Sequence, residues 1–448
     1  MSRKILVALL VLVLVSSFIF AGGSSESKRT DGISLRFLDV NPSPSRQSHF
    51  TKTFEKFKNE TGISVIYESV PWDDAANKLT VLGASSQLPD VMTVWAGWLG
   101  QFTEAGWVEP LAPYIGATMD EYAATVTELV WKGEKELYGG IYTVPDGMMV
   151  KGVFVRKDWS NEAGLKLDPV KGWTYDDYFK TVYALTDKKK NRYGTSFRGA
   201  RGAFDPLFVY LESYNGGAAY ADDGSALFDS PECMEAYKRW CGLYLDGCAP
   251  KDAINWGFVE MVDNFCGGLT GTLINDSEVA ATCIENMTDD QWFVMPMPRS
   301  DKDGKIYNTV NSPYAYSIAT SSTHKKAAWQ LIEYLTRPDN NIEYCKLTGL
   351  IPIKKAVGDD PLYGPDGPYA TFVQQLNDPA MIVPCAFGPF NYTDMHQGTM
   401  HEEMQKYLLG TQSAEKSLTN VSKELETRMK AYLADNPGSS VEKPKGLV

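Results

Sequence analysis

The chain has 448 residues, a formal net charge of −13, 44% hydrophobic residues and 22% charged residues. This length exceeds what one compact hydrophobic core usually supports, so we expect two domains or lobes. The acidic balance disfavours nucleic acid and anionic membrane surfaces as partners. The composition is otherwise ordinary for a globular protein, apart from a high aromatic share of 12% that includes 11 Trp and 24 Tyr.

The N-terminus has the pattern of an export signal. Two basic residues precede an apolar segment, residues 5–20, and small residues follow at 21–23. This order is typical of a secretory signal peptide, which we place at residues 1–23 and expect to be cleaved, whereas a retained anchor is the alternative. No cysteine stands directly after the apolar segment, so we do not expect lipidation. We expect residues 24–32 to be the flexible start of a periplasmic protein.

The cysteines do not form the spacing of a metal site. There are seven, and most of them fall between residues 233 and 283. No C-x-x-C pair occurs, so the sequence predicts neither zinc nor another metal, and the glycine-rich nucleotide motifs are also missing. We therefore predict no cofactor. One or two disulfides could form, but we favour buried free thiols, because disulfide frameworks are typical of small scaffolds.

The chain after the signal begins with alternating strand and helix patterns. Residues 33–40 alternate apolar and polar positions, and residues 45–60 place phenylalanines at helical spacing. A strand over 63–70, a helix over 72–85 and a strand over 91–95 complete a βαβαβ order. This order predicts parallel strands with right-handed crossovers. In such sheets the ligand crevice lies beyond the carboxyl ends of the strands.

The segment 139–159, GGIYTVPDGMMVKGVFVRKDW, decides how this first unit connects to the rest. Two apolar runs flank a Pro-Asp-Gly element, so a simple hairpin would satisfy the local pattern. A second system of helices and strands follows, however, and this order favours a strand that crosses into a second lobe. We therefore expect Met148 and Met149 at the floor of a cleft and not in a solvent-facing hairpin.

The remaining chain mixes helices and short strands. Predicted helices cover 119–132, 174–186, 206–214, 231–245, 259–265, 324–336, 342–347 and 398–434, the last one broken near 410. Predicted strands cover 269–275, 292–297 and 314–319. We expect residues 436–448 to be a disordered tail.

The order of these motifs resembles the family 1 extracellular solute-binding proteins, the carbohydrate-binding subunits of ABC importers, of the maltose-binding type. The motifs are Phe50, Phe54 and Phe57 before Thr61-Gly62, Leu88-Pro89-Asp90-Val91 to Trp95, and the ranges 138–145, 154–158, 173–178, 214–217, 265–275, 292–298, 321–328 and 349–352. Each motif alone is weak, but their order is specific. The run Cys266-Gly267-Gly268-Leu269-Thr270-Gly271 departs from the Gly-Lys-Ala-Ala-Met pattern of the family, and we expect it to affect lobe packing and one ligand contact.

The resemblance implies an α/β, two-lobe periplasmic binding protein fold of type II, with the ligand in a cleft between lobes that are joined by crossing hinge segments. Lobe one would comprise residues 33–148 plus 312–356, and lobe two 149–311 plus 370–448. Besides the segment 139–159, crossings are expected near 306–312 and within 355–369. The implied function is that of a sugar receptor, which passes its ligand to permease subunits in the inner membrane. We expect a monomer with no nucleic-acid partner.

Sugar binding needs aromatic faces that stack on the pyranose ring and planar polar groups that hydrogen-bond its hydroxyls. The candidates are strand ends, crossing segments and aromatic loops in positions that the family uses for ligand contact. They are Asp39, Asn41, Trp72, Asp73, Trp95, Trp98, Asp146, Tyr210, Trp256, Asn275, Asp276, Asn311, Phe390 and Asn391, with Tyr314 beside the second crossing. For each, a core, cap or turn role is the alternative. We expect Arg198 and Arg201 to be solvated surface residues.

An enzyme is the main alternative, namely a secreted glycoside hydrolase or lyase that uses the same aromatic groove. Cleavage of a glycosidic bond needs two carboxyl groups from separate elements, about 5–9 Å apart. The neighbouring carboxylates of this sequence, such as Asp176 and Asp177, sit at helix starts or turns, and no G-x-S-x-G motif occurs. We therefore predict no catalysis. If the protein is a receptor, its ligand could instead be a polyamine, an organophosphate or a peptide.

Overall fold

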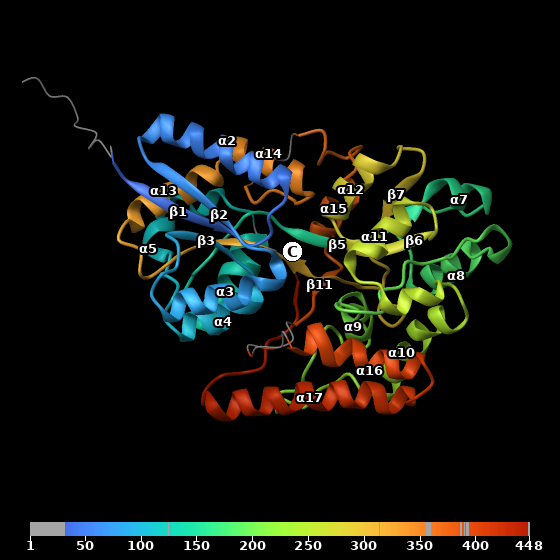
Figure 1. Ribbon diagram of the computed structural model, residues 1–448. Helices are drawn as coiled ribbons and strands as arrows, with labels where there is room; N and C mark the ends of the chain where they lie inside the picture. Colours follow the sequence, from blue (N-terminus) through green and yellow to red (C-terminus); the bar gives the residue numbers. More distant parts are fainter. Residues whose placement is uncertain are drawn as a thin grey trace, which may run out of the picture.

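The computed structural model describes residues 32–123, 125–312, 314–354, 360–385, 388, 390 and 394–446. The predicted signal peptide and Asn391 lie outside these residues, as does the side chain of Asp73. Figure 1 shows two α/β lobes side by side, each built around its own sheet. The predicted fold class therefore agrees with the observed architecture.

The sheet of lobe one has five strands in the order β2-β1-β3-β10-β4. They are β1 (Ser34–Asp39), β2 (Ser64–Ser69), β3 (Val91–Val94), β4 (Val144–Pro145) and β10 (Ala315–Ile318). Strand β1 pairs in parallel with β2 and β3, which confirms the prediction from the βαβαβ order. Strand β10 returns late in the sequence and pairs antiparallel with β3 and β4.

Helices cover both faces of this sheet (Figure 1). They are α2 (Pro44–Thr61), α3 (Trp72–Ala84), α4 (Ala96–Glu104), α5 (Ala112–Ile115), α6 (Lys132–Tyr138), α13 (Lys325–Leu335) and α14 (Pro338–Thr348). The Ser43 side chain caps α2 by accepting a hydrogen bond from the Arg46 amide, and Gly62 ends the helix with φ of 77°. Phe50, Phe54 and Phe57 are buried on the inner face of α2, as their spacing predicts.

The predicted helix over 119–132 is wrong in detail. A 3₁₀ turn, η1 (Gly116–Glu121), and a π-helical segment, η2 (Thr125–Trp131), precede α6. The chain there must bury Tyr122, Val126 and Trp131 together, which a regular helix does not allow because they do not share one stripe.

The sheet of lobe two contains the long strand β5 (Met149–Arg156), which is paired antiparallel on either side. Its neighbours are β6 (Thr272–Asp276), β7 (Trp292–Met295) and β9 (Val310–Asn311). The helices are α7 (Lys157–Glu162), α8 (Tyr175–Leu185), α9 (Phe204–Glu212), α10 (Pro231–Leu245), α11 (Phe258–Cys266), α12 (Val279–Asn286) and α15 (Ala370–Leu376), with η3 (Lys188–Lys190) and η4 (Lys251–Asn255). After the segment η6 (Met395–Thr399), helices α16 (Met400–Leu408) and α17 (Ala414–Asp435) close the lobe along its lower edge (Figure 1).

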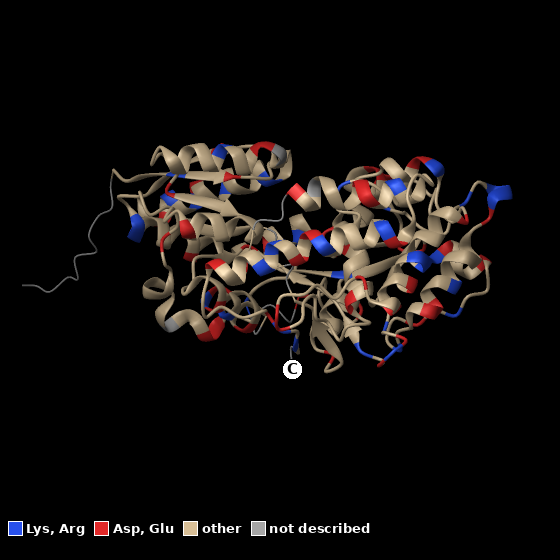
Figure 2. Ribbon diagram, turned by 90° about the horizontal axis from the view of Figure 1, so that it is seen from below, with Lys and Arg blue, Asp and Glu red and all other residues tan. Residues whose placement is uncertain are grey.

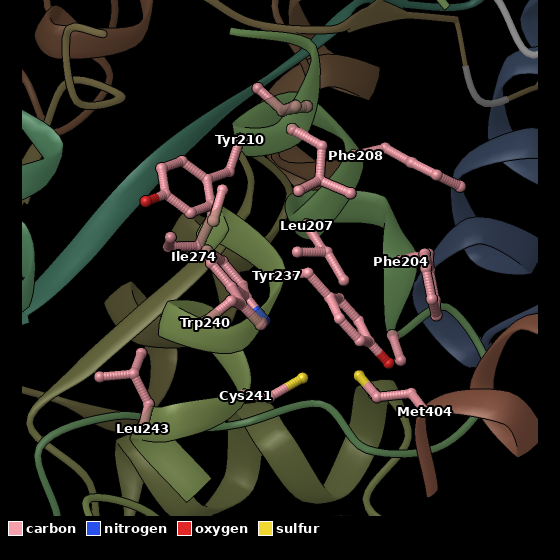
Figure 3. Close-up of a cluster of buried hydrophobic side chains, with 14 of the residues drawn as sticks. Phe204, Leu207, Phe208, Tyr210, Tyr237, Trp240, Cys241, Leu243, Ile274 and Met404 are labelled. Atoms are coloured by element: carbon pink, nitrogen blue, oxygen red, sulfur yellow. The ribbon is translucent and has the colours of Figure 1, made fainter. Parts of the chain in front are cut away.

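The core of lobe two is rich in aromatic residues. Figure 3 shows Leu207 and Tyr210 of α9 beside Tyr237 and Trp240 of α10. These side chains are buried, and burial of such large groups contributes roughly 1.5–3 kcal/mol each. The aromatic content noted in the sequence is therefore partly a packing feature of this lobe.

The turn Cys266–Gly271, which departs from the family pattern, joins α11 to β6 in this lobe. A Cβ at Gly271 would lie 3.1 Å from the Leu185 side chain, so the glycine permits close packing of the turn. This observation is consistent with the expected effect of the departure on lobe packing.

The segment 139–159 crosses between the sheets and is not a hairpin. Strand β4 pairs with β10, whereas β5 pairs with β6, β7 and β9, so the two apolar runs belong to different sheets. Met148 between them exchanges two backbone hydrogen bonds of 2.8 Å with Ile351. Met148 and Met149 are 1% and 9% exposed, which excludes a solvent-facing position.

The C-terminal segment is ordered, so the predicted disordered tail is wrong for residues 436–446. Strand β12 (Lys445–Gly446) joins β8 (Ile306–Tyr307) and β11 (Met381–Val383) in a small three-stranded sheet. Val441 is buried, and Lys445 Nζ lies 3.1 Å from Glu136 Oε2 in α6. The polar composition gave no signal of this docking, because the pairing of Val383 with Lys445 and of Ile382 with Gly446 is a main-chain contact.

Charge on the surface is mixed. Figure 2 shows acidic and basic residues side by side on the helices of both lobes. Within the described residues, none of the helices combines the length and the apolar character that crossing a bilayer requires.

All seven cysteines are free thiols, and only Cys266 is not buried. Its Sγ lies 3.9 Å from Cys283 Sγ, and the hydrogen bond between them lowers the pKa of Cys266.

A cysteine reacts faster when its pKa is low and its sulfur is accessible to solvent. Brief treatment of the native protein with a maleimide should therefore label Cys266 first, as peptide mass spectrometry can measure. Cys266→Ser should remove the fast phase, and equal labelling of Cys241 would contradict the expectation.

Candidate functional site

A cavity of about 150 Å³ lies between the lobes. Its lobe-one wall comes from the start of α2, the end of α14 and the segment before β10, and its lobe-two wall from the turn before α12. The lining residues are Asn41, Ser43, Ser45, Arg46, Glu278, Tyr314, Leu347, Thr348 and Leu350. Polar groups therefore dominate a cleft that residues far apart in sequence create together.

Arg46 is held at this wall by a buried ion pair. Its guanidinium donates to Asp39 from Nη2 (2.7 Å, to Oδ1) and from Nε (3.2 Å, to Oδ2). Asp39 also accepts from the Tyr67 hydroxyl at 3.0 Å and from the Asn41 amide at 3.0 Å. Asp39 is the last residue of β1, as predicted. It is 0% exposed, and its carboxylate oxygens are occupied by hydrogen bonds from Arg46, Tyr67 and Asn41. Asp39 therefore neutralises and positions Arg46 at the wall of the cleft.

Asn41 and Tyr314 form a neighbouring polar pair. Asn41 Nδ2 donates to the Tyr314 hydroxyl at 2.8 Å, and both residues line the cavity. The Tyr314 ring also lies 5.1 Å from the Arg46 guanidinium, and burial raises the pKa of this tyrosine. The hydroxyl is therefore neutral and remains a donor or acceptor for a ligand.

Three tryptophans, Trp72, Trp95 and Trp98, extend this wall and form what we call the tryptophan cluster. Trp72 stacks on Trp98 with ring centroids 4.8 Å apart, and it meets Tyr314 edge-on at 5.6 Å. Trp95 meets Trp72 edge-on at 5.8 Å. Trp98 is 5% exposed, whereas Trp72 and Trp95 are only half-buried. Trp98 thus supports the other two, whose accessible faces suit stacking on an apolar ring face.

Lobe two approaches the tryptophan cluster with a charged group. The His396 ring lies 6.4 Å from the Trp95 ring, and its Nε2 lies 2.8 Å from Asp205 Oδ1. Arg198 Nη1 donates to Asp205 Oδ2 at 3.3 Å. Burial opposes ionisation of Asp205, but His396 and Arg198 outweigh it and lower its pKa. The expectation that Arg198 is a solvated surface residue is wrong, because it is bound to Asp205 with its side chain 13% exposed.

The end of β6 adds a second pair on the lobe-two side. Lys151 Nζ of β5 lies 2.8 Å from Asp276 Oδ2, and both side chains are largely buried. Among the described residues, Asn275 Nδ2, Asp276 Oδ1 and Ser277 Oγ are buried without a hydrogen-bond partner. Leaving such groups unpaired costs free energy.

Glu278 directly follows this turn and lines the cavity. No hydrogen bond or ion pair reaches its carboxyl group within the described part of the chain. Burial, followed by the charge of Asp276, raises the pKa of Glu278 to about 7, although Lys151, Arg198 and Arg46 act against the rise.

This shift predicts how Glu278→Gln changes stability with pH. The folded pKa lies above the ordinary value of about 4.3, so ionisation favours the unfolded chain and the penalty grows as pH rises to about 7. The variant should raise the free energy of unfolding at pH 8 by on the order of 1–3 kcal/mol, and by less at pH 5. Urea unfolding at both pH values measures this, and an equal effect at pH 5 and 8 would contradict it.

The structure places other predicted residues away from the cavity. Tyr210 is 0% exposed in the core of lobe two, and its hydroxyl lies 3.1 Å from that of Tyr214 (Figure 3). Trp256 is also buried there, with its Nε1 donating to Asp252 at 3.1 Å. Phe390 packs partly buried against the same core, and Asn311 is exposed on β9.

Asp146 lies behind the cavity wall. It is 0% exposed, and it accepts a hydrogen bond of 2.6 Å from the Tyr344 hydroxyl, which Arg46 also contacts. Burial raises the pKa of Asp146 to about 7. Of the predicted residues, Asn41 lines the cavity, and Trp72 and Trp95 adjoin it through the contact of Trp72 with Tyr314. Asn275 and Asp276 precede the lining residue Glu278, and Asp39, Trp98 and Asp146 are buried.

Sequence reasoning did not select several cleft residues. Lys151 interrupts the apolar run of β5, and a lysine in a buried strand is a signal for a paired or functional charge. Arg46 stands in the first turn of α2, where the helix dipole disfavours a cation. The pairing of His396 with Asp205 joins residues 191 positions apart and has no local signal.

No group of His, Cys, Asp and Glu in the described ranges has the arrangement of a metal site.

The sequence profile of the bacterial extracellular solute-binding proteins matches residues 41–342 of the chain. An erythritol/L-threitol-binding protein of Mycolicibacterium smegmatis is 24% identical over 70% of this chain and 69% of its own length. A maltotriose-binding protein of Pyrococcus abyssi is 25% identical over 67% of this chain and 62% of its own length.

Solved structures show the same architecture. Maltose-bound MalE3 of T. maritima has a TM-score of 0.74 and 20% identity, and the match covers 88% of this chain and 100% of that one. A solute-binding protein of Agrobacterium vitis with bound D-mannitol has a TM-score of 0.70 and 22% identity, covering 89% and 99%. The fold is thus the predicted type II periplasmic binding protein fold. Since the family profile spans most of the sequence, the chain belongs to the bacterial extracellular solute-binding protein family.

Proposed function

We propose that the protein is an exported receptor that captures a sugar between its lobes and delivers it to the permease of an ABC importer. The observation that carries this proposal is the tryptophan cluster, with half-buried aromatic faces opposite the polar groups of Arg198, Asp205 and His396. Stacking faces combined with planar polar groups are the combination that sugar rings require. The relatives named for erythritol/L-threitol and maltotriose support this ligand class.

The lobes would be residues 33–148 plus 312–356, and 149–311 plus 370–448. The change of sheet between β4 and β5 supports the first boundary, and the change between β9 and β10 supports the second. A ligand that touches both walls stabilises the closed arrangement only through contacts that improve on closure. The closed form would then be the one that the permease recognises.

Mass spectrometry of material released from the purified protein tests the ligand class directly. In parallel, a thermal-shift panel should contain sugars and polyols, a polyamine, an organophosphate and a peptide. A ligand at 100 times its dissociation constant adds about 2.7 kcal/mol of stability, which raises Tm measurably. A rise with the polyamine and with no saccharide would show that the sugar proposal is wrong.

We further propose that the protein binds without catalysing a reaction and that it is secreted as a monomer. Incubation with oligosaccharides should leave them intact, and release of shorter products would contradict the receptor function. The mass of the mature protein from an exporting host should correspond to cleavage near residue 23 without a lipid. Light scattering should give the mass of one chain.

A further inference from the structure

The charged side chains of the cleft are matched in pairs, with one exception. Arg46 binds Asp39, Lys151 binds Asp276, and Arg198 with His396 binds Asp205. Every cation that reaches the cleft walls in the described residues therefore already has a carboxylate partner. Glu278 is left over, because its carboxyl group lines the cavity and no hydrogen bond or ion pair reaches it from the described residues.

The backbone of Glu278 is held in place at the boundary of the lobes. A Cβ built on Gly349, at the end of α14, would lie 2.6 Å from the Glu278 Cα. This close approach of α14 leaves little room for the Glu278 backbone to move away from the cavity. Asn275 in β6 and Ser277 beside Glu278 are 5% and 0% exposed and have side-chain polar atoms without partners in the described structure.

The opposite wall of the cavity offers hydroxyl and amide groups. Ser43, Ser45 and Thr348 line it together with Asn41, Tyr314 and Arg46, and the charge of Arg46 is already paired with Asp39. These groups suit the hydroxyls of a polyol or sugar, whereas a partly buried carboxylate without a partner calls for a positive charge. An anionic ligand would add a second negative charge beside Glu278 and Asp276.

We propose that the natural ligand carries a protonated amino group as well as hydroxyls, as an amino sugar does, and that Glu278 binds this group. The inference rests on the proposed sugar-receptor function and narrows its ligand class. The ammonium group would donate to the Glu278 carboxylate. The sugar ring would then lie near Tyr314, which lines the cavity and contacts Trp72 of the tryptophan cluster. Hydrogen bonds to charged groups contribute more free energy than neutral ones. A sugar with the amine should therefore bind more tightly than the same sugar without it.

The test compares saccharides that differ only at carbon 2 of each ring. The probes are cellobiose, its 2-amino analogue (the glucosamine dimer) and its 2-acetamido analogue, together with the three matching monosaccharides. Isothermal titration calorimetry at pH 6, where the amines are charged, measures the dissociation constant of each probe. An amino sugar that binds should have a Kd about tenfold to a hundredfold lower than the hydroxyl and acetamido sugars of the same size.

Proton release gives a second signature. Because burial raises the pKa of Glu278 to about 7, a large part of a proton should leave Glu278 when it binds the ammonium group at pH 6. Titrations in buffers of different ionisation enthalpy measure this number. Glu278→Gln should abolish both the proton release and the preference for the amine, whereas Glu285→Gln, an exposed position on the same helix α12, should change neither.

The outcomes separate this inference from the function on which it rests. Neutral and amino sugars that bind equally, or a preference that survives in Glu278→Gln, would overturn the amine inference and leave the sugar receptor standing. Binding of a simple polyamine with no saccharide bound would overturn both. Thermal unfolding of each variant at pH 6 checks that its fold is retained.

Discussion

Replacing Asp39 by alanine should lower the free energy of unfolding by about 3–5 kcal/mol, because it leaves the buried Arg46 without its partner. Arg46 and Asp39 have side chains only 6% and 0% exposed, so water cannot replace the lost carboxylate. The Tyr67 hydroxyl and the Asn41 amide would lose their acceptor as well. Urea unfolding followed by tryptophan fluorescence measures the change.

A surface pair provides the matched control for this variant. Lys56 and Glu343 are 4.0 Å apart with side chains 58% and 63% exposed, so Glu343→Ala should change stability by less than about 1 kcal/mol. The double variant Asp39→Leu with Arg46→Met should recover part of the loss, because it removes both charges together. A loss of under about 1 kcal/mol for Asp39→Ala would contradict the buried pair.

Replacing Trp95 by alanine should weaken binding of a saccharide that the thermal-shift panel identifies by about 1–3 kcal/mol, which is roughly a fivefold to 150-fold rise in Kd. Trp95 is half-buried between Trp72 and His396, so most of its effect should fall on the ligand and less on the fold. The loss should appear mainly in the dissociation rate, which stopped-flow fluorescence measures.

Two controls interpret the Trp95 result. Trp95→Phe keeps an aromatic face and should retain part of the affinity. Tyr183→Ala removes an exposed aromatic of α8 that does not line the cavity, and it should leave Kd unchanged. An unchanged Kd in Trp95→Ala would show that Trp95 does not contact the ligand and would contradict the prediction.

Several features of the site were predictable because they depend on short-range patterns. The parallel pairing of β1 with β2 and β3 follows from the alternation of strands and helices, and it brings Asn41, Trp72 and Trp95 to the carboxyl edge of one sheet. The phenylalanine spacing similarly identifies the buried face of α2. Tyr210 and Trp256 show the limit of this approach, since an aromatic residue near a cleft and one in a core have the same local sequence.

The sequence by itself determined the family, the two-lobe α/β class and the positions of Trp72 and Trp95 just after strands of the lobe-one sheet. These rest on periodicity, caps and motif order, which act over a few residues at a time. Only the tertiary structure decided which charges meet in the cleft, because Arg46, Lys151, Arg198, Asp205 and Glu278 come from elements far apart in the chain. It also showed that Glu278 alone among them has no partner in the described structure, since pairing depends on distances that no sequence pattern contains.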